Sequence, residues 1–361
     1  MIFGLMTGLR FEKMYYNIVE GMCLEKVNSK RFNWADSIRG ILILLVVLGH
    51  AIQKTLGDGC EENHLWNAIY SFHMAAFMAV SGYLAFRPGG LGGGTNRCIA
   101  LIFRRFRQLI IPFLFWTALL IITNNRITTD AVLKCFLYPD GGLWFLWVLF
   151  FINVIFVVCS SLAERIKVKQ ELIIFLTCIA LIGVMVVLDI RVFGFQFVAY
   201  YFVFYSVGYY LHKYDNMLLT KNVCLIAALT VLWAVMAWFW NMHELPSFLK
   251  KLPLPATITQ YAYRFLTALG AVYVMICVSP KLLNGETTWN RPLIKMGIVS
   301  LGIYTTHFIF LRYIVSWFAS IICSDTAVIS LSFIVGALMS WLIVWVLSKR
   351  KVISQLFLGK L

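Results

Sequence analysis

Thr326-Ala-Val-Ile-Ser-Leu-Ser-Phe-Ile-Val-Gly-Ala-Leu-Met-Ser-Trp-Leu-Ile-Val-Trp-Val-Leu-Ser348 is a run of 23 residues without a single charged side chain. About 20 residues of this kind are enough to cross the ~30 Å hydrocarbon core of a bilayer as a helix. Backbone amides find no water at that depth, so a strand with open edges is excluded there. The run therefore predicts a transmembrane helix.

Similar segments recur along the whole chain. The composition of 61% apolar and 13% charged residues, with a mean hydropathy of +0.82, excludes an ordinary soluble domain. We expect an all-α polytopic membrane protein of about ten transmembrane helices, with no internal repeat. The ten segments are 38–57, 64–86, 106–124, 141–160, 171–189, 192–211, 222–242, 258–279, 293–316 and 325–347.

The basic residues indicate how the chain is oriented. A net charge of +15 can signal nucleic-acid binding, but these lysines and arginines lie in short loops between apolar segments. With both termini in the cytoplasm, 23 of the 31 basic residues fall inside and 6 outside. This bias follows the positive-inside rule and predicts that both termini are cytoplasmic. Membrane lipid is the expected surrounding, and nucleic acid is not an expected partner.

We expect one membrane domain over residues 34–348. A cytoplasmic tail, 1–33, precedes it and a short basic tail, 349–361, follows it. Residues 1–33 mix acidic and basic side chains without an uninterrupted apolar core, so they do not resemble a cleavable signal. The nine cysteines show no metal-like spacing, so we expect neither a metal site nor a disulfide framework. The glycine run 89–94 is expected to be a flexible cytoplasmic link, since no strand precedes it as in a phosphate-binding loop.

Three histidines lie deep within the predicted spans. An ionisable group at mid-bilayer costs roughly 2.5–3.5 kcal/mol on insertion scales, so such groups usually face a cavity or a partner. His50, His73 and His307 lie at similar depths on three helices and can line one site. The alternative is that each one simply hydrogen-bonds to a neighbouring helix.

His50 has the most informative context, Asn33-Trp-Ala-Asp-Ser-Ile-Arg-Gly-Ile-Leu-Ile-Leu-Leu-Val-Val-Leu-Gly-His50. Arg39 stands about 16 Å below His50 on the same helix, at the cytoplasmic mouth. The arginine can attract a polyanionic donor, while a neutral imidazole in an apolar setting can accept a proton. Asp36 can pair with Arg39 or orient that helix end. The alternative for Arg39 is an ordinary topology-determining flank.

Two further patterns suit the same chemistry. Arg104 and Arg107 are spaced i,i+3 at the cytoplasmic side, and the planar guanidinium fork suits phosphate, although a topology flank is again the alternative. His73 and Ser81 lie on nearly the same helix stripe, about 12 Å apart in height, and can line one channel. Gly82 is expected to allow close helix packing.

Together these elements resemble the membrane-bound acyltransferase 3 family over roughly residues 33–345. The Arg39-x10-His50 element is similar to the family's first-span signature. Three further stretches resemble its later motifs in the same order: Ser71-Phe-His-Met-Ala-Ala-Phe-Met-Ala-Val-Ser-Gly-Tyr-Leu84, Arg104-Arg-Phe-Arg107 before Pro112, and Ser300-Leu-Gly-Ile-Tyr-Thr-Thr-His307.

The resemblance implies transfer of an acyl group, commonly acetyl from acetyl-CoA, to a hydroxyl of an extracytoplasmic carbohydrate. It also implies location in the bacterial inner membrane. Acyl-CoA is then a donor substrate, and no cofactor is permanently bound. Arg104 and Arg107 would hold the coenzyme A phosphates with help from Arg39. His50 would act as the base, or as a transient acyl-histidine. The expected supporting or acceptor-binding residues are His73, His307, Ser81 and Asp36.

Two other classes remain as alternatives. An exporter of a glycan or lipid-linked sugar would also line its path with buried His and Arg, but it would need no cytoplasmic coenzyme A site. A sensor or scaffold would show no turnover and would tolerate substitution of His50. Arg264 and Arg312 lie inside predicted spans and need partners that the sequence does not assign.

Overall fold

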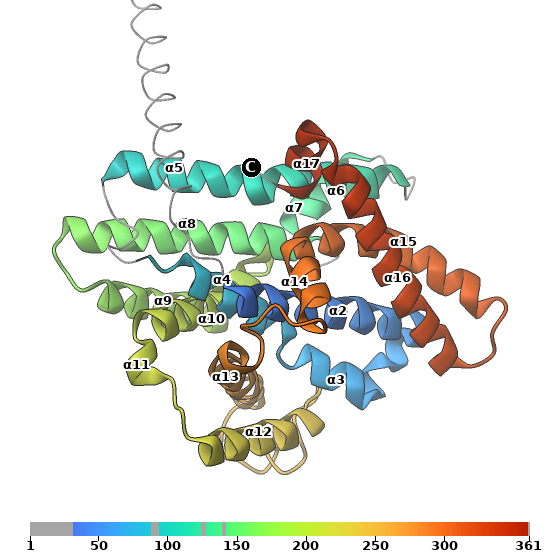
Figure 1. The fold of residues 1–361 in the computed structure, drawn as a ribbon. Coiled ribbons are helices and arrows are strands. Elements are labelled where there is room, and N and C mark those ends of the chain that lie inside the picture. The colour runs from blue at the N-terminus through green and yellow to red at the C-terminus, as the bar shows by residue number, and fades with distance from the viewer. Residues whose placement is uncertain (1–31, 88–93, 124–127, 139–141, 360–361) are drawn as a thin grey trace, which may run out of the picture.

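The computed structural model describes residues 32–87, 94–123, 128–138 and 142–359, and these ranges contain helices and no strand. Figure 1 shows α2 near the centre of the bundle, with α5 and α8 on one side and α12 and α13 on the other. The α-helices are α2 (Asn33–Leu56), α3 (His64–Tyr70), α4 (His73–Ala85), α5 (Thr95–Arg105), α6 (Ile111–Thr123), α7 (Thr129–Leu137), α8 (Trp144–Arg165), α9 (Gln170–Leu188), α10 (Phe195–Lys213), α11 (Asp215–Leu218), α12 (Val223–Trp238), α13 (Ala256–Leu282), α14 (Asn290–Ile298), α15 (Ser300–Ala319), α16 (Asp325–Ser348) and α17 (Lys351–Leu358).

Three short elements complete the described chain. Two are 3-10 turns, η2 (Gly57–Glu62) and η5 (Val192–Gly194), and one is the π-helical turn η3 (Phe106–Ile110). The glycine run predicted as a flexible link falls on residues 88–93 for all but its last glycine, and so lies outside the described residues.

Within the described ranges, eight helical stretches are long and apolar enough to cross a membrane, and a bent helix pair makes a ninth. This confirms the all-α polytopic class. The predicted span 222–242 corresponds to α12, which has only 16 residues and covers about 24 Å. The predicted span 106–124 begins earlier, at Thr95, because the amphipathic α5 continues through η3 into α6.

The predicted span 293–316 is not one straight helix. Helices α14 and α15 meet at Val299 with a bend of 79°. Apolar residues continue across the break, so hydropathy alone gave no sign of it. As a result, α15 begins inside the bundle, beside α2, and its first residue Ser300 is buried there.

Large apolar side chains also cover the outer faces of the bundle. Val187 on α9, Val231 on α12 and Leu338 on α16 are 78%, 64% and 56% exposed. A soluble protein rarely exposes a contiguous apolar surface of this kind, whereas lipid covers it at no cost.

Glycines bring α4 and α10 into backbone contact. A Cβ atom added to Gly82 would lie 1.9 Å from the carbonyl oxygen of Tyr205, and one added to Gly208 would lie 1.9 Å from that of Ala79. Small residues at such crossings let two helices approach closely in a membrane. The packing role predicted for Gly82 is confirmed.

A second reciprocal pair joins α2 to α14. A Cβ on Gly40 would lie 2.1 Å from the carbonyl oxygen of Leu293, and one on Gly297 would lie 1.7 Å from that of Asp36. This contact holds α14 against the first half of α2 and thereby fixes the bend at Val299 next to Arg39.

Candidate active site

The three intramembrane histidines gather at one level of the bundle. The His50 ring on α2 and the His307 ring on α15 have centroids 5.3 Å apart. Tyr70 on α3 links His50 to His73, because its ring centroid lies 6.4 Å from that of His50 and 4.9 Å from that of His73. Three helices distant in sequence thus bring their imidazoles around a common centre.

Carbonyl oxygens determine which nitrogen of His50 carries the proton. Its Nδ1 lies 3.0 Å from Oε1 of Gln53, which can only accept a hydrogen bond. The Tyr70 hydroxyl donates to the same oxygen at 3.3 Å. His50 is therefore protonated at Nδ1, and the lone pair that can accept a proton is on Nε2.

The other two histidines have the same tautomer. Nδ1 of His73 donates to the carbonyl of Ile69 at 2.7 Å, and Nδ1 of His307 donates to that of Ile303 at 2.9 Å. The His307 ring is held by the preceding turn of α15 and the His73 ring by the last turn of α3, so each offers Nε2 as an acceptor. Nε2 of His307 is buried and has no hydrogen-bond partner in the described part of the chain.

The histidines differ in access. His307 is 1% and His73 is 5% exposed, whereas His50 is only partly buried. Of the three, His50 is the ring that a substrate can reach with the least rearrangement. Phe308 also packs against it, with ring centroids 5.7 Å apart.

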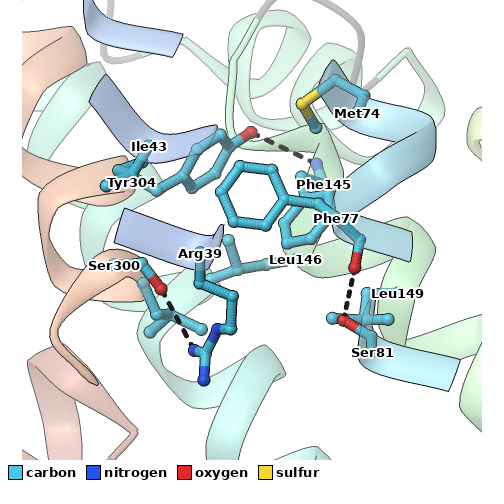
Figure 2. Close-up of a pocket in the computed structure, with 11 residues that line it drawn as sticks. Arg39, Ile43, Met74, Phe77, Ser81, Phe145, Leu146, Leu149, Ser300 and Tyr304 are labelled. Atoms are coloured by element: carbon cyan, nitrogen blue, oxygen red, sulfur yellow. Dashed lines mark hydrogen bonds between the residues drawn. The ribbon is translucent and has the colours of Figure 1, made fainter. Parts of the chain in front are cut away.

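A small cavity of about 60 Å³ lies nearer the start of α2, and Figure 2 shows its walls. Arg39 points into it and donates from Nη2 to Oγ of Ser300 at 3.1 Å. Nη1 of Arg39 lies 3.6 Å from the Asp36 carboxylate, as the predicted pairing requires. Ser81 lines the opposite wall, and its hydroxyl donates to the carbonyl of Phe77 at 2.8 Å.

The first turn of α15 forms one wall of this cavity. Ser300, Leu301 and Tyr304 all line it. The positive end of the α15 dipole therefore lies at the cavity, close to the Arg39 guanidinium. The bend at Val299 creates this arrangement, and together the two groups favour an anion or a polarised carbonyl there.

The cavity ends one helical turn short of the histidines. Tyr304 and Met74 are among its lining residues, but none of the three histidines is. His307 follows Tyr304 by three residues and His73 directly precedes Met74, so the separation is at most about one turn. The backbone amide of Phe145 donates to the Tyr304 hydroxyl at 3.3 Å and holds that ring across the inner end.

A cluster of arginines lines a second cleft, also of about 60 Å³. Arg104 lies there with Arg87 and Arg105, and Asn153 and Tyr205 add polar groups to the lining. The Tyr205 hydroxyl donates to Oδ1 of Asn153 at 3.1 Å. Three guanidinium groups in one cleft suit a polyanion such as a phosphate group.

Arg107 was predicted to pair with Arg104, but it is not among the residues that line this cleft. Helix α5 ends at Arg105, and Arg107 falls in the π-helical turn η3. A π turn widens the helix and rotates the residues that follow, so the i,i+3 spacing no longer places both side chains on one face. The phosphate-binding role of Arg107 stays a prediction.

The arginine cleft and the Arg39 cavity are neighbours. Leu149 of α8 lines the cavity and Asn153, one turn later, lines the cleft, and Nδ2 of Asn153 donates to the Leu149 carbonyl at 2.7 Å. On α4, Ser81 lines the cavity and Leu84 lines the cleft. Cleft, cavity and histidine thus follow one another along α4, and α8 lines the first two.

The two unassigned arginines have different surroundings. Arg264 is partly buried, donates from Nη1 to the carbonyl of Met242 at 3.4 Å, and lies 5.6 Å from the Trp240 ring. Arg312 is exposed on α15, and its guanidinium lies 5.6 Å from the ring of Tyr313. It lies seven residues before the end of α15, about 10 Å, a distance over which a long side chain can reach the interface.

Sequence reasoning missed several residues of the site. Gln53 follows His50 by three residues, a spacing that puts both on one helix face, and this signal was available. Ser300 and Tyr304 lie in the motif that ends at His307 but were given no role, and Tyr70 gave no signal, because the roles of all three depend on how distant helices meet. Among the described residues, no three His, Cys, Asp or Glu side chains are grouped so that they could hold a metal ion.

Comparison with known proteins agrees with this site. The family model described as an acyltransferase domain matches residues 32–349. Nodulation protein NolL of Sinorhizobium fredii is 34% identical over 176 residues, which is 45% of this chain and 47% of that protein. Nodulation protein NolL of Mesorhizobium japonicum is 32% identical over 143 residues, 36% of each chain.

The chain thus spans less than half the length of the curated relatives it matches. No solved structure matches it. The family match covers every helix that contributes to the cleft, the cavity and the histidine cluster. This chain is therefore a multi-pass membrane protein that belongs to the acyltransferase 3 family.

Proposed function

We propose that this protein transfers an acyl group, acetyl being our first candidate, from cytoplasmic acyl-CoA to a hydroxyl of an extracytoplasmic carbohydrate. We place it in the bacterial inner membrane with both termini in the cytoplasm, on the strength of the positive-inside bias. The observation that carries the proposal is the order of three features along α4: arginine cleft, Arg39 cavity, histidine cluster.

The donor would enter at the arginine cleft. Arg87, Arg104 and Arg105 would hold the phosphates of coenzyme A, and the pantetheine arm would extend past Ser81 into the Arg39 cavity. From Ala85, which lines the cleft, to His73 the rise along α4 is about 18 Å, which is of the order of the extended arm. The present cavity is too small for the whole arm, so donor binding requires side chains around Tyr304 to move.

The reaction would then centre on Nε2 of His50. This nitrogen accepts the proton of the acceptor hydroxyl as the oxygen attacks the thioester carbonyl. The tetrahedral oxyanion collapses, the carbon–sulfur bond breaks, and the imidazolium returns its proton to the departing thiolate. The products are the carbohydrate ester and free coenzyme A. An acyl-histidine formed on His50 is the alternative route.

The other groups would support these steps. Gln53 keeps the His50 proton on Nδ1, and the buried imidazole of His307 lies close enough to orient the acceptor hydroxyl. Asp36 holds Arg39, and the positive end of α15 beside Arg39 would stabilise negative charge on the donor.

Radiolabelled acetyl-CoA, a mixed glycan acceptor and the purified protein provide the direct test. We expect labelled glycan and a matching amount of free coenzyme A. An exporter would move glycan across a vesicle membrane without consuming the thioester, and that result would contradict the proposal.

Charge removal in the cleft gives a sharper prediction. Arg104→Gln should raise KM for acetyl-CoA about tenfold, because a charge-assisted hydrogen bond contributes about 1.5–3 kcal/mol. KM for S-acetylpantetheine, which lacks the nucleotide phosphates, should stay unchanged. Steady-state kinetics with both donors make the comparison. Arg291→Gln, which removes an exposed arginine of α14, is the matched control. Equal losses with both donors would show that Arg104 does not bind the nucleotide.

Gln53 is predicted to position His50. Gln53→Leu removes the acceptor that holds the Nδ1 proton, so we expect kcat to fall roughly five- to tenfold, the value of one hydrogen bond. KM for the donor should stay unchanged. Gln53→Glu retains an acceptor at this position and should recover most of the activity. An unchanged kcat in Gln53→Leu would contradict the positioning role.

A further inference from the structure

A larger cavity opens at the opposite end of α2 from Arg39. It has a volume of about 430 Å³ and lies between the loop that follows α12 and the first turn of α13. This volume falls within the roughly 300–1,000 Å³ usual for small-molecule sites. It is unconnected with the arginine cleft, since the two share no lining residue.

The lining of this outer cavity is rich in hydrogen-bonding groups of mixed charge. His243, Glu244, Lys250, Thr257 and Gln260 supply an imidazole, a carboxylate, an ammonium, a hydroxyl and an amide. Leucine side chains form much of the remaining wall. Carboxylate and ammonium offset each other, so the cavity does not favour a polyanion. Donors, acceptors and apolar patches in one cavity suit the hydroxyls and C–H faces of a neutral sugar.

The loop that carries these groups is held in place from within. Oδ1 of Asn241 accepts from the backbone amides of His243 and Glu244 at 2.8 and 2.9 Å. Nε2 of Gln260 donates to the carbonyl of Met242 at 3.2 Å. These bonds fix the backbone, so the side chains of His243 and Glu244 are presented on an ordered loop and not on a free one.

The outer cavity is tied to the helix that carries His50. Nδ1 of His243 lies 2.8 Å from the Glu61 carboxylate, at the end of η2, and Asn241 donates to the Glu61 carbonyl at 3.3 Å. Leu249, which lines the cavity, and Tyr70, which faces His50, pack against one buried cluster around Trp66 and Trp240. A continuous packed layer therefore joins the cavity to the histidine cluster.

The separation decides what kind of ligand can use both places. Helix α2 extends six residues, about 9 Å, beyond His50, and the outer cavity lies past its end, where η2 carries Glu61. A monosaccharide cannot occupy the cavity and reach His50 at once, whereas a chain of several sugar units can.

We propose that the outer cavity is a docking subsite for a neutral oligosaccharide, which holds sugar units remote from the hydroxyl that is acylated. The inference rests on the proposed carbohydrate acceptor and adds the location and the minimum length of its binding site. Binding energy from the remote units would lower KM for long acceptors and leave that for short ones unchanged.

The test uses neutral gluco-oligosaccharides of one to six units, with the purified full-length protein. Binding is measured by saturation-transfer NMR on the His50→Ala variant, and transfer is measured with labelled acetyl-CoA on the parent. Two variants disturb the cavity in different ways: Glu244→Ala with Lys250→Ala removes polar contacts, and Ala256→Trp fills the space. Glu286→Ala, an exposed carboxylate of another loop, is the matched control.

We expect both cavity variants to weaken hexasaccharide binding at least about fivefold, the loss of one hydrogen bond, and to raise its KM while kcat stays unchanged. Monosaccharide kinetics and the control should not change. Hexasaccharide binding equal to that of the parent in both variants would overturn the inference, even if transfer is robust. Cavity-dependent binding without any transfer would instead uphold the subsite and refute the proposed reaction.

Discussion

His50→Ala is expected to reduce acyl transfer by about 10²–10⁴-fold, the usual contribution of a positioned general base. The substitution removes the imidazole of the one histidine in the cluster that is not fully buried. It leaves Gln53 with the hydrogen bond from Tyr70, so no buried acceptor is left without a donor. The variant should therefore insert and fold like the parent. Transfer is measured with labelled acetyl-CoA, after the protein amount and elution profile in detergent have been matched.

His64→Ala is the control for this loss. His64 is an exposed histidine that stacks on Trp238, with ring centroids 4.1 Å apart, away from His50. It should retain parental activity. Full activity in His50→Ala would contradict the assignment of His50 as the general base. Mass spectrometry of the parent, quenched after mixing with acetyl-CoA alone, separates the two routes: an acetylated His50 peptide supports the covalent intermediate.

Gly82→Val should cost the most stability of any single change considered for this chain. Its added Cβ would meet the Tyr205 carbonyl oxygen at 1.9 Å, a backbone atom that cannot move aside like a side chain. Overpacking of this kind costs typically 1–3 kcal/mol, and more where backbones must separate. We expect a clearly lower thermal midpoint in detergent, or no recoverable folded protein.

Gly183→Val is the matched control for Gly82→Val. Gly183 is also a helical glycine, but a Cβ there would meet nothing within 4 Å. Its thermal midpoint should stay close to that of the parent. If the two variants were equally stable, the close crossing of α4 and α10 would not be important for the fold.

Much of the architecture could be predicted because the bilayer imposes it. Apolar length specifies the helices, and the predicted segments correspond to observed ones from α2 to α16. The exceptions arise where length and hydropathy carry no geometric information. The 79° bend at Val299 occurs within an apolar stretch without proline, and it depends on the contact of Gly297 with α2, which no local pattern reveals.

The candidate site was predictable only in part, for a similar reason. His50, His73 and His307 could be selected because ionisable groups are costly in lipid, and they do gather. Arg104 and its neighbour Arg105 could be found by charge, but Arg87 joins them in the cleft only through the fold, which no local spacing reveals. The π turn that carries Arg107 away depends on backbone geometry, which side-chain spacing does not report.

The short helix α14 bears on how the protein is made. Its nine residues span about 14 Å, which is too short to cross a bilayer, and it carries the charged residues Arg291 and Lys295. It reaches its place only by docking on Gly40 of α2, a segment translated roughly 250 residues earlier. The nascent chain must therefore keep its first helix accessible until nearly the last one has emerged, and release of α2 into bulk lipid before that moment would leave α14 without a binding surface.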